Sequence, residues 1–254
     1  MKKKIFYFFA HQDDEFGIFI QIKKEIKNNE LFIFYLTSGT NKKINKNKLY
    51  LRDKESIKTL TSLGIKRQNI YFIGRKLGIN HNTLYLNAKK VTHFLENFIS
   101  NTHKPSLIYT HSWEGGHEDH DTCNLITRRI KKKFKIKNCY QFSLYNAFNT
   151  SILFFKVFNP IHKRNIKKIF ANIFDRIFFI KLLFNYTSQI KTWIGLYPFI
   201  ISHYFFRGFN YIEELDKNLT IKRPHKGELL YEKRNFCKFS KLKKRTDFLL
   251  KFKS

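Results

Sequence analysis

Cysteine is scarce in this sequence, and its scarcity excludes two kinds of small, cross-linked domain. The three cysteines, Cys123, Cys139 and Cys237, include no C-x-x-C pair, and their number is odd. Neither a disulfide framework nor a zinc knuckle built from cysteines is therefore indicated. A reducing compartment suits such a chain, so we expect a cytoplasmic protein.

Glycine and proline are also few, at 10 and 4 of 254 residues, while 43% of the residues are hydrophobic and 17% are aromatic. Disordered chains have the opposite composition, so this chain is expected to fold around a substantial core. Its length suits one large domain. We predict an α/β domain over residues 1–215, followed by a basic C-terminal extension over residues 216–254 in which no chemistry is apparent.

Acidic residues are the third shortage, because 19 of them face 49 lysines and arginines, which gives a formal net charge of +30. Such an excess attracts polyanions, whether nucleic acid, acidic glycan or an anionic lipid surface. The abundance of lysine, asparagine, isoleucine and phenylalanine is equally typical of an AT-rich genome. Charge alone therefore does not choose between a partner and a compositional bias.

Long hydrophobic runs are missing as well. The longest uncharged candidate, residues 192–206, falls short of ~18 residues and contains Pro198, Ser202 and His203. A membrane-spanning helix is not expected there, whereas an interfacial segment with aromatic side chains at the headgroup level remains open. Residues 1–4 (Met-Lys-Lys-Lys) imitate the start of a signal peptide, but acids follow after about six apolar residues, so we interpret this segment as a first strand.

The sequence does contain short apolar runs that alternate with helical patterns. Strands alternating with helices predict β-α-β units and a mainly parallel sheet, so we expect an α/β fold of the Rossmann-like three-layer type. Residues 154–206 are aromatic and basic without a clear period. The predicted strands are residues 5–9, 31–36, 70–73, 107–110 and 139–145, and the predicted helices are residues 15–27, 49–63, 84–100 and 121–134.

Two polar clusters lie where predicted strands end. Residues 10–15 (Ala-His-Gln-Asp-Asp-Glu) follow the first strand, and residues 111–121, which include Gly-His-Glu-Asp-His at 116–120, follow the strand at 107–110. The carboxyl ends of parallel strands share one edge of a sheet, and binding sites collect there. We therefore expect the two clusters to meet on one rim.

The residue types in these clusters suit a metal-dependent hydrolase. Catalytic zinc commonly takes three ligands from His and Asp or Glu and keeps a fourth position for water. His11, Asp14 and a histidine of the second cluster supply such a set, although spacing does not decide between His117 and His120. A bound metal lowers the pKa of water, a free carboxylate such as Asp13 can take the proton, and the remaining histidine can assist the oxyanion or the departing amine.

Each cluster also has a purely structural explanation. Asp13 and Asp14, between a strand and a helix, suit an N-cap and first-turn acids, and the glycines at 115–116 suit an ordinary loop. Yet each cluster supplies what the other lacks for a metal site, and both follow predicted strands. A joint site is therefore the better interpretation, with Asp119 available to orient one of the imidazole rings.

Residues 10–15 resemble the A-H-P-D-D-E signature of the PIG-L/LmbE-like deacetylases, and residues 116–120 resemble the G-H-P-D-H of the same family. Members of that family are usually zinc-dependent and remove the acetyl group from N-acetylglucosamine units. The resemblance implies that His11, Asp14 and His120 bind the metal, that Asp13 is the general base and that His117 assists the transition state.

Weaker similarities extend the resemblance over roughly residues 4–215. Residues 37–39 (Thr-Ser-Gly) fall at the T-x-G turn of the family, and Arg52-x-x-Glu55 is similar to its R-x-x-E helix, where Arg52 would contact the sugar. Residues 186–189 and 207–213 resemble its Y-x-S-Q and R-G…Y-x-E segments.

The chain also departs from the family pattern. Gln12 and Glu118 replace the usual prolines, and a change there alters the stiffness of the loop more than the ligation. Leu77 stands where the family often has an acid that helps to hold the sugar. This last departure leaves the sugar that is recognised open, but it does not affect the metal chemistry.

We therefore expect a zinc-dependent N-deacetylase, an amidohydrolase acting on an N-acetylglucosamine-type sugar in a glycan, glycolipid or related conjugate. Its basic surface would bring it to the inner face of an anionic membrane or to a lipid-linked glycan, and nucleic acid is not the expected partner. The alternative is a catalytically idle member of the fold that binds an anionic glycan, lipid or nucleic acid through its charge. The complete ligand set argues against that alternative.

Overall fold

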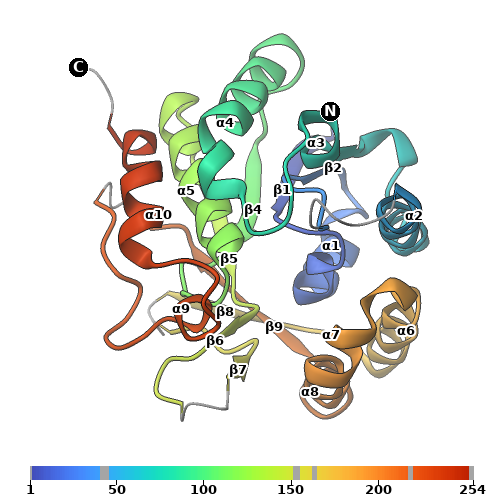
Figure 1. The fold of residues 1–254 in the computed structure, drawn as a ribbon. Coiled ribbons are helices and arrows are strands. Elements are labelled where there is room, and N and C mark those ends of the chain that lie inside the picture. The colour runs from blue at the N-terminus through green and yellow to red at the C-terminus, as the bar shows by residue number, and fades with distance from the viewer. Residues whose placement is uncertain (1, 41–45, 151–154, 162–164, 217–219, 252–254) are drawn as a thin grey trace.

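A seven-stranded sheet with the order β3-β2-β1-β4-β5-β9-β8 forms the centre of the molecule (Figure 1). The computed structural model describes residues 2–40, 46–150, 155–161, 165–216 and 220–251. The strands from β3 to β5 are parallel, and β9 and β8 complete the sheet in antiparallel fashion. Their bounds are β1 Lys3–Phe9, β2 Asn29–Tyr35, β3 Ile70–Phe72, β4 Leu107–His111, β5 Asn138–Phe142, β8 Ile166–Phe170 and β9 Phe209–Glu214.

Helices cover both faces of this sheet, so the predicted three-layer α/β fold with a mainly parallel sheet is confirmed (Figure 1). One face is covered by α1 Phe19–Glu25, α2 Lys46–Ser62 and α6 Ile173–Leu183, and the other by α3 Ile73–Leu77, α4 Leu84–Asn101, α5 Glu118–Lys133 and α10 Phe239–Thr246. The shorter elements are β6 Tyr145–Asn146, β7 Lys156–Val157, α7 Ile190–Gly195, α8 Tyr197–Ser202, α9 Leu230–Lys233 and the single turns η1 Asp14–Ile18, η2 Arg67–Asn69, η3 Thr187–Gln189, η4 His203–Arg207 and η5 Asp247–Leu249.

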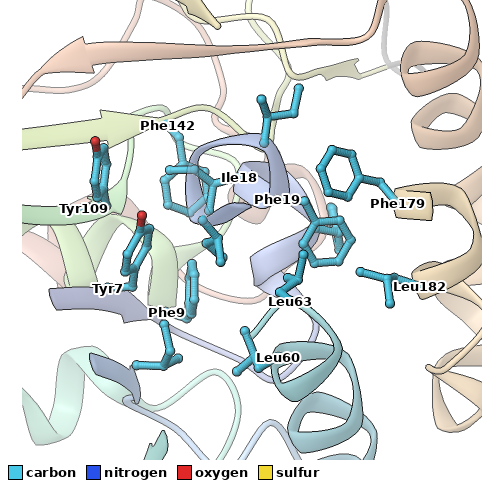
Figure 2. Packing of buried hydrophobic residues seen from close by; sticks show 14 of the residues in the cluster. Tyr7, Phe9, Ile18, Phe19, Leu60, Leu63, Tyr109, Phe142, Phe179 and Leu182 are labelled. Atoms are coloured by element: carbon cyan, nitrogen blue, oxygen red, sulfur yellow. The ribbon is translucent and has the colours of Figure 1, made fainter. Parts of the chain in front are cut away.

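The first strand shows why a continuous apolar run forms the centre of the sheet. Ile5, Tyr7 and Phe9 belong to the apolar cluster on the α1 side, whereas Phe6 and Phe8 belong to the cluster on the α4 side. Successive side chains of a strand point to opposite faces, and both faces of this strand are covered. Figure 2 shows Tyr7 and Phe9 on the side of the sheet where Phe19 and Phe179 also pack.

Two predicted boundaries are wrong for identifiable reasons. The helix expected to begin at residue 121 begins at Glu118, because the ring of His117 caps it by accepting the N–H of Asp119 at 3.1 Å and acids fill its first turn. The strand expected to continue to residue 145 ends at Phe142, because the carboxylate of Glu114 accepts the next backbone N–H groups, at 2.8 Å from Leu144.

The segment predicted as a C-terminal extension packs against the α4 side of the sheet. Leu229, Tyr231, Leu242 and Leu249 are buried in the same apolar cluster as Phe6. The division of the chain at residue 215 stays a prediction. Among the described residues, we find no helix that is both long enough and apolar enough to traverse a bilayer.

The order of the strands reverses direction between β1 and β4, which are direct neighbours with Ile5 opposite Leu107 and Phe8 opposite Thr110. Ligands of open parallel sheets bind outside the carboxyl ends of the strands at such a reversal. The loops that leave β1 and β4 carry the two polar clusters, so the fold brings both to this point.

Candidate active site

The chain leaves β1 through a strained turn at Asp13. This residue has φ 98°, a conformation that residues other than glycine rarely adopt. Its backbone N–H donates to the carboxylate of Glu15 at 3.0 Å, and the hydroxyl of Tyr186 donates to the other oxygen of Glu15 at 2.6 Å. Glu15 therefore holds the turn in place, and the turn presents Asp13 and Asp14 to the rim.

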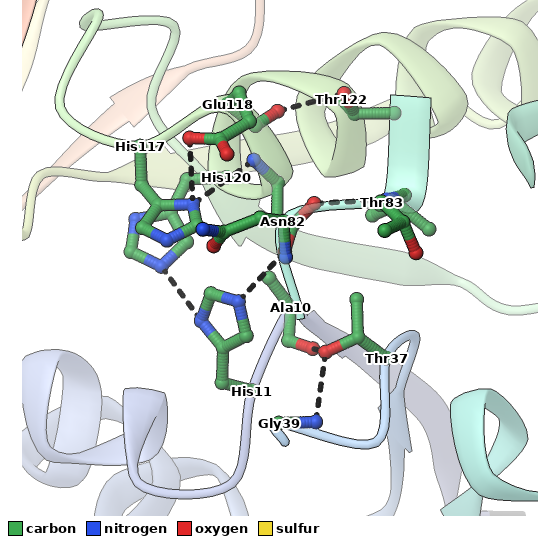
Figure 3. Close-up of polar contacts among 12 residues, drawn as sticks. Ala10, His11, Thr37, Gly39, Asn82, Thr83, His117, Glu118, His120 and Thr122 are labelled. Carbon is green, nitrogen blue, oxygen red and sulfur yellow. Dashed lines mark hydrogen bonds and ion pairs between the residues drawn. The ribbon is translucent and has the colours of Figure 1, made fainter. Parts of the chain in front are cut away.

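Three side chains from the two clusters, those of His11, Asp14 and His120, converge at one point of the rim. His11 Nδ1 lies 3.3 Å from His120 Nε2, His120 Nε2 lies 3.2 Å from Asp14 Oδ1, and His11 Nδ1 lies 3.5 Å from Asp14 Oδ2. Around a tetrahedral zinc ion with bonds of about 2.0–2.1 Å, neighbouring donors are about 3.4 Å apart. The three side chains therefore already have the spacing of zinc ligands, whichever oxygen of Asp14 is used. Figure 3 shows His11 and His120 of this set facing one another.

Asp119 orients the first of these ligands. One of its oxygens accepts His11 Nε2–H at 3.0 Å and the backbone N–H of Asn82 at 2.7 Å, while the other accepts the N–H of Leu84 at 2.9 Å. Nε2 thereby keeps its proton, and Nδ1, which faces Asp14 and His120, is the nitrogen that binds a metal once it is deprotonated. The sequence predicts that Asp119 orients one of the imidazole rings, and His11 is the ring that its carboxylate contacts.

The charges around His11, Asp14 and His120 favour the binding of a cation. Burial alone would lower the pKa of His11, but Asp14 and Asp119 outweigh burial and raise it to about 10. Burial would raise the pKa of Asp14, yet His120, His111 and His11 hold it well below its usual range. Burial lowers the pKa of His120 to about 4, so this ring is neutral and free to act as a ligand. A divalent cation fits both the donor set and the charge.

His117 offers a proton donor beside the ligand set. Its Nδ1 accepts the N–H of Asp119, so the proton of the neutral ring lies on Nε2. That Nε2 is buried and has no hydrogen-bond partner in the described part of the chain. Burial lowers the pKa of His117 well below its usual range, so the ring is neutral at pH 7.

Asp13 and Arg52 lie next to one another. Arg52 Nη2 donates to the carbonyl oxygen of Gln12 at 2.6 Å and lies 3.5 Å from Asp13 Oδ1. Burial raises the pKa of Asp13 to about 8 and outweighs the opposing effect of Arg52, so this carboxylate is an unusually strong base. Gly39 makes room for Arg52, because a Cβ at this residue, which has φ +64°, would lie 2.9 Å from Arg52 Nε.

These side chains surround a cavity of about 110 Å³. Its floor comes from the rim of the parallel strands and its outer wall from η3, α7 and Leu196, which follows α7. Among the described residues that line it, Arg52 is the one with a permanent positive charge. The lining residues are His11, Asp13, Asp14, Phe16, Arg52, His81, His117, Tyr145, Gln189, Thr192 and Leu196.

All seven site residues expected from the sequence meet at this rim. Five of them line the cavity, namely His11, Asp13, Asp14, Arg52 and His117. The other two, His120 and Asp119, contact His11. The roles of these residues are proposals.

Sequence reasoning missed His81 and Tyr145. The ring centroid of His81 lies 4.5 Å from that of His11 and 4.9 Å from that of His117, and the ring of Tyr145 lies 5.4 Å from that of His120. His81 follows β3 and α3, so it belongs to a loop on the same rim as the two motifs. The rule that sites collect beyond parallel strands could have identified it.

Three other residues of interest have clear positions. His111 lies with Nε2 3.1 Å from Asp14 Oδ2, and its ring stacks on His120 at 4.0 Å. Glu114 accepts hydrogen bonds from residues 143–146 and does not line the cavity. Leu77 packs against the apolar cluster beside α4, away from the cavity.

The outer wall of the cavity is tied to the rest of the site by a carboxylate of α2. Glu55 accepts the hydroxyl of Thr187 at 2.8 Å, and the backbone N–H and hydroxyl of Ser188 at 2.7 and 2.5 Å. The weak resemblance at residues 186–189 therefore has a structural counterpart, because Tyr186 and Ser188 anchor the wall to which Gln189 belongs.

The family model described as PIG-L, GlcNAc-PI de-N-acetylase, matches residues 6–131. That segment includes both polar clusters. The chain belongs to the PIG-L/LmbE-like family. No protein with a curated description matches it in sequence.

Solved structures of deacetylases resemble this PIG-L-like chain in fold. The zinc-inhibited form of a teicoplanin deacetylase aligns with a TM-score of 0.62 and 9% identity, covering 85% of this chain and 100% of that one. The deacetylase of the A40926 pseudoaglycone aligns with a TM-score of 0.53 and 13% identity over 77% and 86% of the two chains. A conserved protein from Thermus thermophilus aligns at 0.57 and 14% over 88% and 98%. At these identities the likeness establishes the fold alone.

Proposed function

We propose that this chain is a metal-dependent amidohydrolase that removes the N-acetyl group from an N-acetylglucosamine-type sugar. The observation that supports the proposal most strongly is the convergence of His11, Asp14 and His120 at the spacing of zinc ligands. Asp13, a base with a raised pKa, and His117, a neutral donor, line the same cavity. The description of the matching family, a de-N-acetylase, agrees with this chemistry.

His11, Asp14 and His120 would hold the metal ion, which would supply a water of lowered pKa and would polarise the amide carbonyl. Asp13 accepts a proton from that water as its oxygen bonds to the carbonyl carbon. His117 donates its Nε2–H to the carbonyl oxygen as negative charge develops there. The proton held by Asp13 then passes to the amide nitrogen as the C–N bond breaks, so that acetate and a free amine are released.

The size of the cavity limits what enters it. Its volume of about 110 Å³ is close to four times the ~30 Å³ that one water molecule occupies in the liquid. An acetamido group, with four heavy atoms, fits this space, whereas a sugar ring would lie at the mouth. Arg52 lines the cavity and is our candidate for binding a sugar oxygen beside Asp13.

Zinc is the metal we propose, on the basis of the two imidazoles and one carboxylate that form the set. One structural neighbour is a deacetylase described as zinc-inhibited, so the identity and amount of metal must be varied in any assay. We further propose a cytoplasmic location, which rests on the three unpaired cysteines of the sequence.

Acetate release is the experiment that tests this function. The protein is stripped of metal, loaded separately with one equivalent of Zn²⁺, Co²⁺ or Mn²⁺, and given N-acetylglucosamine, nucleotide-linked N-acetyl sugars and N-acetylated glycolipids. We expect at least one metal and one substrate class to yield acetate and amine in equal amounts.

The Asp13→Ala variant should retain its metal and lose acetate release by a factor on the order of 10²–10⁴. Asp175→Ala, which removes an aspartate paired with Lys23 outside the cavity, is the matched control and should keep full activity. Unchanged activity of the Asp13 variant would contradict the assignment of the base. Absence of acetate with every metal and substrate would contradict the deacetylase function.

A further inference from the structure

The most exposed large apolar side chains of the described chain lie in one stretch. Phe174, Ile194 and Phe206 are 80%, 78% and 75% exposed, more than any other described large hydrophobic residue. We call the exposed apolar surface of residues 170–206 the aromatic face. It comprises Phe170, Ile173, Phe174, Ile177, Phe184, Ile194, Phe199, Phe205 and Phe206.

Helix α6 shows that this exposure follows a pattern. Ile173, Ile177 and Phe184 recur at helical spacing on one side of the helix, while Phe179 and Leu183 on the other side are fully buried in the core. A helix that is apolar on all sides normally has partners all around it, so the outer side of α6 has an apolar surface that the fold does not cover.

The elements that carry the aromatic face form one corner of the molecule. Figure 1 shows α6, α7 and α8 close together there. The turn η4, which contains Phe205 and Phe206, packs against both α6 and α8. The exposed apolar residues therefore belong to one packed unit and not to separate loops.

Positive charge accompanies the aromatic residues. The exposed cations between residues 165 and 208 are Lys167, Lys168, Lys181, Lys191 and Arg207. The one acid between residues 165 and 208 is Asp175, which forms an ion pair with Lys23 at 2.9 Å. A second copy of the same face would bring these cations against one another, which disfavours self-association. An anionic surface would neutralise them.

We propose that the aromatic face docks on the surface of an anionic lipid bilayer. Aromatic and aliphatic side chains enter the headgroup region of a bilayer, and lysine and arginine above them attract anionic lipid. The elements are too short to cross the bilayer, so the attachment is peripheral. This inference goes beyond the proposed deacetylase function and holds whether or not that function is correct.

Helix α7 connects the docking surface to the candidate active site. Its Thr192, together with Leu196 just after it, lines the cavity, while Ile194 between them is 78% exposed in the aromatic face. Docking would therefore bring the outer wall of the cavity to the membrane surface.

Vesicle flotation with the full-length protein tests the proposal. Vesicles of equal parts phosphatidylcholine and phosphatidylglycerol are compared with vesicles of phosphatidylcholine alone, at low and high salt. We expect the protein to float with the anionic vesicles and to be released by salt. The triple variant Phe174→Ser, Ile194→Ser, Phe206→Ser should bind on the order of a hundredfold more weakly. Its matched control is Leu86→Ser, an exposed apolar residue of α4 outside the face.

A second variant tests the charge separately. Lys168→Gln combined with Lys181→Gln should weaken binding about fivefold for each charge, whereas Lys89→Gln on α4 should have a smaller effect. Hydrolysis of a water-soluble substrate, or the circular dichroism spectrum if there is none, verifies that the variants fold.

Three outcomes would overturn the proposal. The first is failure of the native protein to float with anionic vesicles, and the second is equal binding by the triple variant. The third is a dimer in solution that the triple variant abolishes while vesicle binding is absent, because the face would then serve self-association.

Discussion

The rim beyond β1 and β4 and the corner formed by α6, α7 and α8 differ in the kind of side chain that they bring together. The rim buries acids and imidazoles, and its Asp14 and Asp119 raise the pKa of His11 to about 10, which marks a position that favours a cation. The corner exposes phenylalanines next to lysines. The partners that we propose for them differ accordingly, a metal ion for the rim and an anionic lipid surface for the corner.

Replacing a proposed ligand should have the largest effect, and it tests the rim. His120→Ala should abolish activity, and saturating zinc should no longer stabilise the protein, a loss of about 3–4 kcal/mol. Metal analysis and thermal unfolding with and without zinc measure both effects. His93→Ala, an exposed histidine on α4, should behave like the native protein. Equal zinc binding by the two variants would refute the ligand assignment.

His117→Gln should have the next largest effect. Loss of the Nε2–H donor is expected to lower kcat by about 10²–10³ while the metal content stays constant. Steady-state kinetics with acetate detection checks the first expectation, and metal analysis checks the second. A variant that lost its metal instead would assign His117 to the ligand set.

Glu114 supports the rim from the side and should make stability depend on pH. Burial raises the pKa of its carboxyl to about 7, above the 4.5 of an exposed glutamate. The folded state therefore holds this proton more tightly than the unfolded state. The resulting stabilisation is complete below pH 4.5 and is lost as the pH rises through 7.

Comparison with Glu114→Gln isolates this contribution. Between pH 5 and pH 8 the native protein should lose about 2 kcal/mol of unfolding free energy relative to the variant, as measured by urea denaturation. A difference that does not change with pH would show that Glu114 is ionised in the folded protein throughout this range.

The smallest effect is expected on the outer side of α6. Phe174→Ala should change the free energy of unfolding by less than about 0.5 kcal/mol because this side chain is 80% exposed. Phe179→Ala on the same helix should cost about 3–5 kcal/mol because this ring is buried between α1 and η4. Chemical denaturation of both variants checks the contrast, and a large loss in Phe174→Ala would mean that another part of this chain covers the face.

The sequence allowed prediction of most of the parallel half of the fold. The runs at 5–9, 31–36 and 107–110 became β1, β2 and β4 because a strand buried on both faces must be apolar at consecutive positions. The antiparallel strands β8 and β9 and helix α6 could not be predicted. The described residues between 155 and 206 combine exposed and buried aromatic residues, which hides the period that normally separates the two.

The candidate site could be predicted to the extent that its residues lie in motifs. His11, Asp13 and Asp14 are adjacent in the chain, and His117, Asp119 and His120 form a second short motif, so ligand chemistry could be recognised in each. His81 has no such neighbours and reaches the cavity only because the loop after α3 returns to the rim.

The sequence by itself determined the kinds of atoms at the rim and the strand ends that carry them, because both depend on residues close together in the chain. Only the tertiary structure decided which atoms face one another. Asp119 contacts His11, 108 residues away, and the hydroxyl of Tyr186 contacts Glu15, 171 residues away. Such pairs depend on the order of the strands and the packing of α6 to α8, and no local pattern encodes them.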